Sequence, residues 1–204
     1  MSVDILNKIN QRYLQALGVH RCSAELFTFL AFNGFAEMHK HRYFCESKTQ
    51  LEISEFIIAS TNTLPEITAI PQENVLAVRK NRLQIQPNEV WNLIKENFYS
   101  YRIWESETLS ILEECARQLS SSGDVLSELF VKRLCAENFE ELQTVNEYCI
   151  AYSAIDYNLE QLRSEQDTLA ERYIFLTTTI NGKPKMYHHF NSYVDKNLRG
   201  IIND

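Results

Sequence analysis

The chain has 204 residues, of which 45% are apolar and 23% are charged. Only five Gly and four Pro occur, which excludes collagen-like, low-complexity and linker-dominated chains and argues against a turn-rich β-sandwich or barrel. Twenty basic and 27 acidic residues give a formal net charge of −7. Nothing therefore indicates a nucleic-acid groove, which needs a clustered positive field.

Cysteine usage and hydropathy indicate a cytoplasmic protein. The five cysteines are widely spaced, odd in number and form no C-x-x-C motif, so we expect reduced thiols. No apolar run approaches the ~20 residues of a transmembrane helix. The stretch MSVDILNKINQR also lacks a signal-peptide core. We expect neither a membrane nor a nucleic-acid partner.

Four long segments with few helix breakers predict four helices, because their apolar residues recur at spacings of three and four. In the second segment Phe44, Leu51 and Ile58 share one face, and in the fourth Leu126, Leu129 and Leu134 belong to the expected stripe. The expected helices run from Val3 to Phe32, from about Gly34 to Ser60, from just after Pro87-Asn88-Glu89 to about Leu119, and from Val125 to about Tyr157.

The stretch from Leu64 to Gln86 contains two Pro and reads as a long extended connection. Long connections without their own structure are uncommon in compact domains. One architecture requires such a connection, namely two antiparallel helix pairs joined by a crossover as long as the bundle. The sequence therefore predicts an all-α four-helix bundle with a long crossover between its second and third helices.

The C-terminal part predicts additional structure outside the bundle. A charged helical stretch runs from Leu159 to Arg172, and the tail Tyr173–Asp204 contains a strand-like TTTI and a short amphipathic piece from Tyr187 to Ile202. We expect a bundle over residues 1–157. We expect residues 158–204 to form a C-terminal helix and tail packed on the bundle or on partner subunits.

Acidic residues inside the apolar stripes of the third and fourth helices carry the candidate chemistry. Glu105 is bracketed by apolar residues, and Glu137 and Glu141 are four apart with Asn138 beside them. Inward carboxylates from facing helices can form di-iron sites. Pairs of the form E-x-x-x-E also occur on solvated helix faces, and spacing alone leaves both interpretations open.

The order of these residues resembles the second half of a ferritin subunit. The matching features are Trp91, Glu105, Ile111-Leu112-Glu113, Ala116, Gly123-Asp124, Phe130 and Glu137-Asn138-Phe139-Glu140-Glu141. ILNKINQRYLQAL, GFAEMHKHRYFCES and TNTLPEITAIP resemble the first half. The resemblance covers about residues 4 to 155 and implies the ferritin-like bundle with its long crossover.

The resemblance also implies a degenerate ferroxidase centre of the non-haem bacterial type. Glu105 matches the family's glutamate on the third helix, and Asn138 and Glu141 match its glutamine and glutamate on the fourth. Ala16 replaces the bridging glutamate of the first helix. The E-x-x-H motif of the second helix falls on Glu46 and Thr49, or on Thr49 and Glu52. Neither placement supplies the histidine.

These matches imply Glu105, Glu141, Asn138, Glu46 and Glu52 as candidate metal ligands. Two iron ions need a bridging carboxylate, so we expect one weakly bound divalent ion, such as iron, or no metal at all. Without a cation, the carboxylates would repel one another unless one were protonated or paired with a cationic group. His20 lies on the first helical stripe, as a further ligand or as a core histidine.

Two functions follow and stay open. The first is an iron-binding, iron-handling ferritin-like subunit with weak or absent ferroxidase activity. The second is a metal-free bundle that serves as an assembly or interaction module. A third interpretation, a helical oxidase of the haem-oxygenase-like fold, fits the tail YHHFNSYVDKN poorly. The abundance of aromatic residues predicts a homo-oligomer, a dimer or larger.

Overall fold

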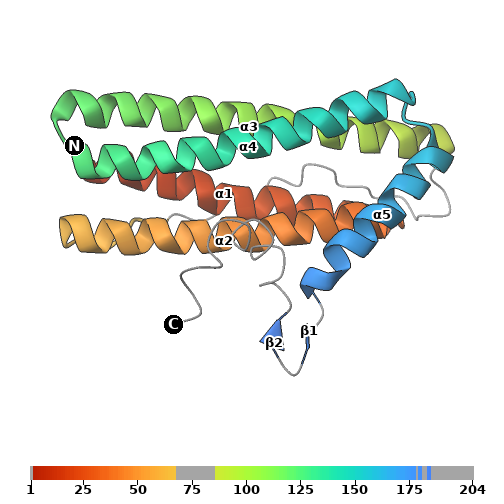
Figure 1. The fold of residues 1–204 in the computed structure, drawn as a ribbon, viewed down its shortest axis with the longest axis horizontal. Coiled ribbons are helices and arrows are strands. Elements are labelled where there is room, and N and C mark those ends of the chain that lie inside the picture. Colours follow the sequence, from red (N-terminus) through yellow and green to blue (C-terminus); the bar gives the residue numbers. More distant parts are fainter. Residues whose placement is uncertain (1, 68–85, 178, 181–182, 185–204) are drawn as a thin grey trace, which may run out of the picture.

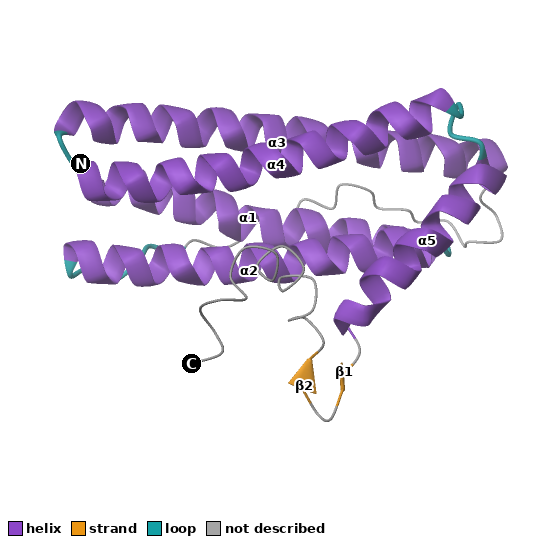
Figure 2. Cartoon of the chain, in the orientation of Figure 1, coloured by secondary structure: helices purple, strands orange, loops and turns teal. Residues whose placement is uncertain are grey.

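The computed structural model describes residues 2–67, 86–177, 179–180 and 183–184. Its four long helices are α1 (Ser2–Phe29), α2 (Asn33–Thr61), α3 (Pro87–Ser122) and α4 (Val125–Ala154). Figure 1 shows α1 and α2 as one antiparallel pair and α3 and α4 as a second pair alongside. The predicted four-helix bundle is confirmed, and helices dominate the described chain (Figure 2).

The ends of the helices require the predicted crossover. α2 ends and α3 begins at opposite ends of the bundle (Figure 1), so the connection between Thr61 and Pro87 spans its length. The start of the connection lies along α1, where Asn10 Nδ2 and Gln11 Nε2 donate to the Glu66 carbonyl oxygen at 3.2 and 2.7 Å. Residues 68–85 of the predicted connection lie outside the described part.

Local sequence signals set the boundaries of α3 and α4. Pro87 occupies the first turn of α3, where its missing N–H costs nothing, and Gln86 forms a capping box with Glu89. Gly123 follows the last residue of α3, and its φ of +74° favours glycine. Asp124 then caps α4 by accepting a hydrogen bond from the Ser127 N–H at 3.1 Å.

Two apolar clusters fill the bundle, one towards each end. The aromatic cluster contains Phe27, Phe32, Phe35, Phe98 and Tyr152, together with aliphatic neighbours. The aliphatic cluster contains Leu6, Ile9, Ile53, Ile57, Leu112, Leu119, Val131 and Leu134. Along each helix, the residues between the two clusters include polar side chains. We call this the polar layer, and it comprises His20, His39, Arg42, Glu46, Glu105, Asn138 and Glu141.

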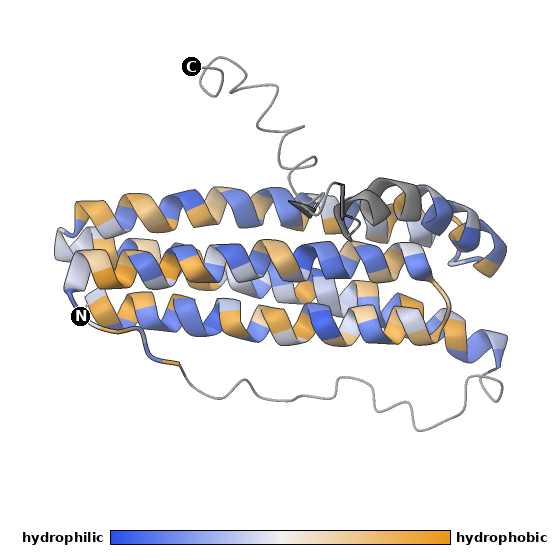
Figure 3. Ribbon diagram, turned by 90° about the horizontal axis from the view of Figure 1, so that it is seen from below, coloured by the Kyte–Doolittle hydropathy of each residue, from blue (hydrophilic) through white to orange (hydrophobic). Residues whose placement is uncertain are grey.

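The inward faces of α2 and α4 differ from two of the predicted stripes. The α2 face formed by Phe44, Leu51 and Ile58 points outward, and these side chains are 41%, 58% and 45% exposed. On α4, Leu126 and Leu129 are also exposed. Apolar and polar positions alternate around each helix (Figure 3). Periodicity finds a row of apolar residues, whereas packing against the other helices selects which row is buried.

A fifth helix, α5 (Leu159–Thr177), crosses α2 at the end of the bundle where α1 and α2 are joined (Figure 1). Gln166 Oε1 accepts a hydrogen bond from the Gly34 N–H at 2.9 Å, and Leu162 and Leu169 join the aromatic cluster. The helix extends beyond the predicted end at Arg172. The division of the chain into a bundle and a separate C-terminal unit from residue 158 stays a prediction.

The strand-like TTTI contains a short strand, as expected. β1 (Thr179–Ile180) pairs antiparallel with β2 (Lys183–Pro184). The amphipathic piece predicted for Tyr187–Ile202 lies outside the described residues. No disulfide joins any of the five cysteines, all of which lie in the described ranges, and two of them, Cys115 and Cys149, are buried. Within the described ranges, no helix combines the length and apolarity that membrane crossing requires.

Candidate functional site

The candidate site is the polar layer at mid-bundle, and its α3–α4 part is a buried carboxyl–amide pair. Asn138 Nδ2 donates a hydrogen bond to Glu105 Oε2 at 2.6 Å. Only 2% of Glu105 and 7% of Asn138 are exposed. Both residues belong to the inward rows of their helices, so the predicted inward orientation of this pair is found.

An arginine lies between two glutamates at the centre of the layer. The Arg42 guanidinium contacts Glu46 Oε1, one turn further along α2, and Glu141 Oε2 on α4, each at 2.9 Å. The Tyr101 hydroxyl, on α3, also donates to Glu141. Burial alone lowers the pKa of Arg42, but Glu141, Tyr101 and Glu46 raise it well above its ordinary value. Arg42 is therefore a permanent cation inside the bundle.

Burial also changes the protonation of two carboxyl groups in the layer, those of Glu105 and Glu46. It raises the pKa of Glu105 to about 8, despite the opposing effect of Arg42. It raises the pKa of Glu46 to about 7, against the same opposing effect of Arg42. At neutral pH Glu105 is therefore predominantly a neutral acid. Repulsion between the carboxyl groups is therefore reduced in two ways: Glu105 is protonated, and Glu46 and Glu141 pair with the Arg42 cation.

Two histidines form a neutral pair next to the carboxyl groups. The Nδ1 atoms of His20 and His39 lie 3.1 Å apart, so one donates and the other accepts. Burial lowers the pKa of His39 to about 3 and that of His20 well below its ordinary value. His20 Nε2 lies 3.9 Å from Glu105 Oε1. Neither of these two atoms has a hydrogen-bond partner within the described chain.

The structure brings four of the five predicted ligands together and leaves one outside. Glu46, Glu105, Asn138 and Glu141 belong to the polar layer, whereas Glu52 lies at the surface and pairs with Arg133 on α4 at 3.1 Å. Of the two placements of the second-helix glutamate, Glu46 is the inward one. A further difference from the family pattern lies on α1, where Ala16 is buried and supplies no ligand atom.

Sequence reasoning missed Arg42, the central residue of the site. A signal was present, because His39, Arg42, Glu46 and Gln50 follow one another at spacings of three and four, in line with Ile53 and Ile57. That row is the buried row of α2. An arginine four residues before a glutamate in a buried row indicates an internal ion pair.

The residues of the layer do not fit the pair of iron ions that a ferroxidase centre holds. A cationic guanidinium contacts the same two carboxylates that would have to bind an ion. A metal ion bound by these carboxylates would lie close to the Arg42 guanidinium, and two positive charges repel strongly in a poorly solvated site. In the part of the chain that the structure describes, no three His, Cys, Asp or Glu residues are grouped to hold a metal ion.

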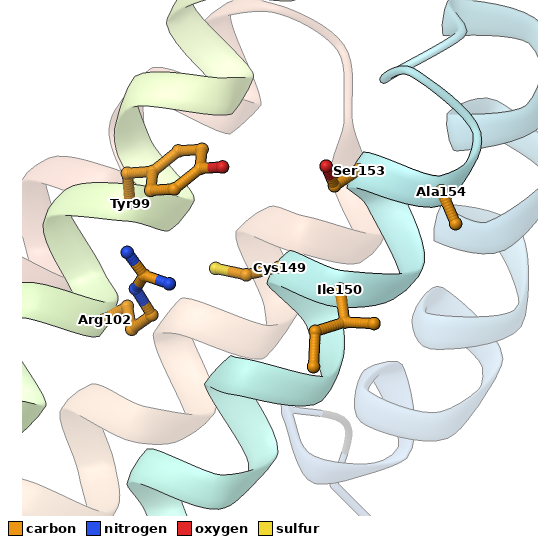
Figure 4. Close-up of a pocket in the computed structure, with 6 residues that line it drawn as sticks. All are labelled: Tyr99, Arg102, Cys149, Ile150, Ser153 and Ala154. Carbon is orange, nitrogen blue, oxygen red and sulfur yellow. The ribbon is translucent and has the colours of Figure 1, made fainter.

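A separate shallow pocket of about 300 Å³ lies between α3 and α4. Figure 4 shows Tyr99 and Arg102 on α3 facing Cys149 and Ser153 on α4. The Arg102 guanidinium lies over the Tyr99 ring, 4.9 Å from its centroid. None of the residues lining this pocket belongs to the polar layer. The pocket has no catalytic arrangement of acids and bases.

Comparison with solved structures identifies the fold. Apo-ferritin from Pseudo-nitzschia multiseries aligns over 82% of this chain and 97% of its own, with 18% identity and a TM-score of 0.64. An open-pore ferritin from Archaeoglobus fulgidus aligns over 83% and 95%, with 14% identity and a TM-score of 0.65. A PmFTN variant soaked in iron aligns over 82% of this chain and 97% of its own, with 18% identity and a TM-score of 0.65. The chain therefore has a ferritin-like fold.

Comparison of the sequence itself gives no family assignment. No protein-family model matches it, and no curated protein matches it. Function therefore has to be argued from the residues of this chain, because one fold supports several functions.

Proposed function

We propose that this chain is a ferritin-like assembly subunit with slow or absent ferrous oxidation at its bundle centre. The observation that carries the proposal is the double ion pair of Arg42 with Glu46 and Glu141. The Arg42 guanidinium neutralises these two carboxylates, so they attract an incoming ferrous ion only weakly.

The surrounding residues support the same proposal. Ala16 provides no bridging carboxylate on α1, and Thr49, where one placement expects a histidine, is a hydroxyl residue at a half-buried position of α2. Two metal ions held together need such a bridge. Glu105 is a neutral acid at pH 7, because its pKa is about 8.

The outward row of α2 supports self-association as the function of the subunit. Phe44, Leu51 and Ile58 are exposed and seven residues apart, which is the spacing of a helix–helix seam. Lys48 and Glu55, also exposed, flank Leu51 on opposite sides. Antiparallel pairing of two copies about Leu51 would bring Lys48 of one copy towards Glu55 of the other. The proposed partner is therefore a second copy of this chain.

A second candidate function is loose binding of one divalent ion. The observation favouring it is that Glu105, Glu141 and Glu46 all lie in the layer, while 20% of the Arg42 side chain is exposed. Displacement of Arg42 towards solvent would free two carboxylates for one ion. This candidate also predicts slow oxidation, since a single ion lacks the second metal of the reaction.

Ferrous oxidation by the unmodified chain tests the first proposal. Anaerobic protein is mixed with ferrous iron and air, and ferric absorbance is followed beside a bona fide ferritin and a protein-free blank. We expect a rate close to the blank. Rapid oxidation of two irons per chain would overturn the proposal. Stoichiometric retention of one ion after gel filtration would favour the second candidate.

Sedimentation tests the proposed assembly. We expect a species larger than the 23.9 kDa chain at micromolar concentration, and Leu51→Glu should shift it towards the monomer. Leu64→Glu is the matched control, because Leu64 is 82% exposed and lies outside the seam. A monomeric parent chain, or equal effects of both substitutions, would contradict assembly through this face.

A further inference from the structure

The pocket between α3 and α4 collects hydrogen-bond donors, and none of its lining residues within the described chain is acidic. Figure 4 shows polar ends facing one another across it, from Tyr99 and Arg102 on α3 and from Cys149 and Ser153 on α4. We propose that this pocket binds a small organic anion, whose carboxylate or phosphate group contacts Arg102 and whose short apolar group packs against Ile150.

The Arg102 guanidinium has no carboxylate partner in the part of the chain that the structure describes. It is half-buried and lies over the Tyr99 ring. Other arginines of the bundle pair with a glutamate, as do Arg12, Arg21, Arg42, Arg117 and Arg133. A guanidinium is a planar fork of donors that matches the oxygens of a carboxylate or phosphate. Arg102 is therefore open to a counter-ion from solution.

The Tyr157 hydroxyl is a second donor without a partner. Tyr157 is 1% exposed, and its hydroxyl makes no hydrogen bond within the described residues. Burial raises its pKa to about 12, and the pocket residues Cys149, Tyr99 and Arg102 also act on this pKa. The hydroxyl is therefore protonated at neutral pH and close to the pocket. A buried donor without a partner is costly, and an anionic oxygen in the pocket would supply that partner.

The turn after α4 holds Tyr157 in this position with backbone strain. Asp156 and Tyr157 have φ values of +49° and +50°, in the left-handed region that bulky residues rarely adopt. The Tyr157 N–H donates to the Tyr152 carbonyl oxygen at 2.8 Å, and Trp91 Nε1 donates to that of Asp156 at 2.7 Å. Strained residues concentrate at ligand sites, where surrounding contacts hold them in place. The turn thus supports a binding role for this end of the bundle.

The size of the pocket and the charge of the chain restrict the ligand. A volume of about 300 Å³ is at the lower end for ligand pockets, which suits a molecule of the size of benzoate. The net charge of −7 repels anions in general, so an anion needs a local site to be retained. This inference goes beyond the proposed function, because no lining residue belongs to the polar layer or to α2.

The experiment titrates the full-length chain with benzoate, phenyl phosphate and neutral benzamide, and follows binding by ligand-observed NMR. Arg102→Gln removes the positive charge. Ser153→Glu, at an exposed position, places a carboxylate of the protein on the opposite wall of the pocket. Arg117→Gln is the matched control, because Arg117 lies on the same helix but pairs with Glu114 outside the pocket. Thermal unfolding verifies that each variant is folded.

We expect at least one of the two anions to bind, and the stronger one identifies the charged group that the pocket prefers. Benzamide should bind about tenfold more weakly, as for the loss of a charge-assisted hydrogen bond. Arg102→Gln and Ser153→Glu should each weaken anion binding by about the same factor, and Arg117→Gln should leave it unchanged. If Arg102→Gln does not fold, Ser153→Glu decides. Absence of binding by both anions, equal binding of benzamide, or an equal loss in Arg117→Gln would overturn the proposal.

Discussion

Two arginines connect α2 and α4 through the same kind of partners, one glutamate on each helix, but at different depths. Arg42 on α2 pairs with Glu46, four residues further along its own helix, and with Glu141 on α4. Arg133 on α4 pairs with Glu137, four residues further along its own helix, and with Glu52 on α2. The Arg42 side chain is 20% exposed, and that of Arg133 is 47% exposed.

The difference in depth gives the two bridges different roles. At the surface, water and salt screen the charges, and the bridge of Arg133 contributes little. In the polar layer the carboxylates have lost most of their hydration, so the cation of Arg42 is required to keep them there. An arginine paired with two glutamates is thus dispensable for stability at the surface, but it is required between the two apolar clusters.

The comparison is tested most strongly by removing each arginine. Arg42→Ala should lower the free energy of unfolding by about 3 kcal/mol, towards the low end for broken buried pairs because the side chain is not fully buried. Arg133→Ala should cost about 0.2–1 kcal/mol. Urea unfolding followed by circular dichroism measures both. Equal losses would show that depth does not separate the two bridges.

A conservative change sharpens the role of the guanidinium. Arg42→Lys keeps the charge but loses the planar fork that reaches two carboxylates at once. We expect a loss of about 1–2 kcal/mol, between the alanine variant and the parent chain, as for one charge-assisted hydrogen bond. The matched change, Arg133→Lys, should leave the urea midpoint nearly unchanged. A neutral Arg42→Lys would mean that charge alone suffices.

Protonation of Glu105 predicts a pH dependence of stability. The carboxyl group ionises near 4.5 when unfolded and at about 8 when folded. Between these values the folded chain binds more protons, so the free energy of unfolding falls as pH rises, by at most about 1.4 kcal/mol per unit. Glu46 contributes with the same sign up to about pH 7.

Glu105→Gln removes this contribution because the amide carries no titratable proton. Between pH 5 and pH 8 the midpoint temperature of thermal unfolding should therefore fall less in the variant than in the parent chain. Glu52→Gln, on the surface bridge, is the matched control. Equal changes in the two pH profiles would contradict a buried neutral Glu105.

Salt gives the smallest expected effect. At roughly 1 M salt the screening length falls to ~3 Å, so the cost of Arg133→Ala should vanish. The cost of Arg42→Ala should persist, because ions do not penetrate the layer. Urea unfolding of both variants at low and high salt measures the difference. Loss of both costs at high salt would place Arg42 in an aqueous environment.

The sequence predicted the helices well because their signals are local. Breaks at Gly123 and Pro87 act within a few residues, and the long connection before Pro87 needs only chain length to imply a crossover. The inward orientation of Glu105, Asn138 and Glu141 was implied by the resemblance to ferritins, because spacing alone left a solvated helix face open as well.

The centre of the site could not be predicted in the same way. The choice between Glu46 and Glu52 depends on which row of α2 faces α4, and both rows contain apolar residues. Arg42 was missed because its second partner, Glu141, lies almost one hundred positions away in the chain. A search for metal ligands considers acids and histidines, and it overlooks a cation that the chain supplies itself.

The polar layer also restricts how the helices can slide along one another. Displacing α2 by one turn, about 5.4 Å, would move Arg42 away from Glu141 and towards apolar side chains of one cluster or the other. Apolar clusters alone tolerate such shifts, because one aliphatic contact resembles the next. A layer of matched charges and hydrogen bonds tolerates them poorly, so it selects a single axial register for the two helix pairs.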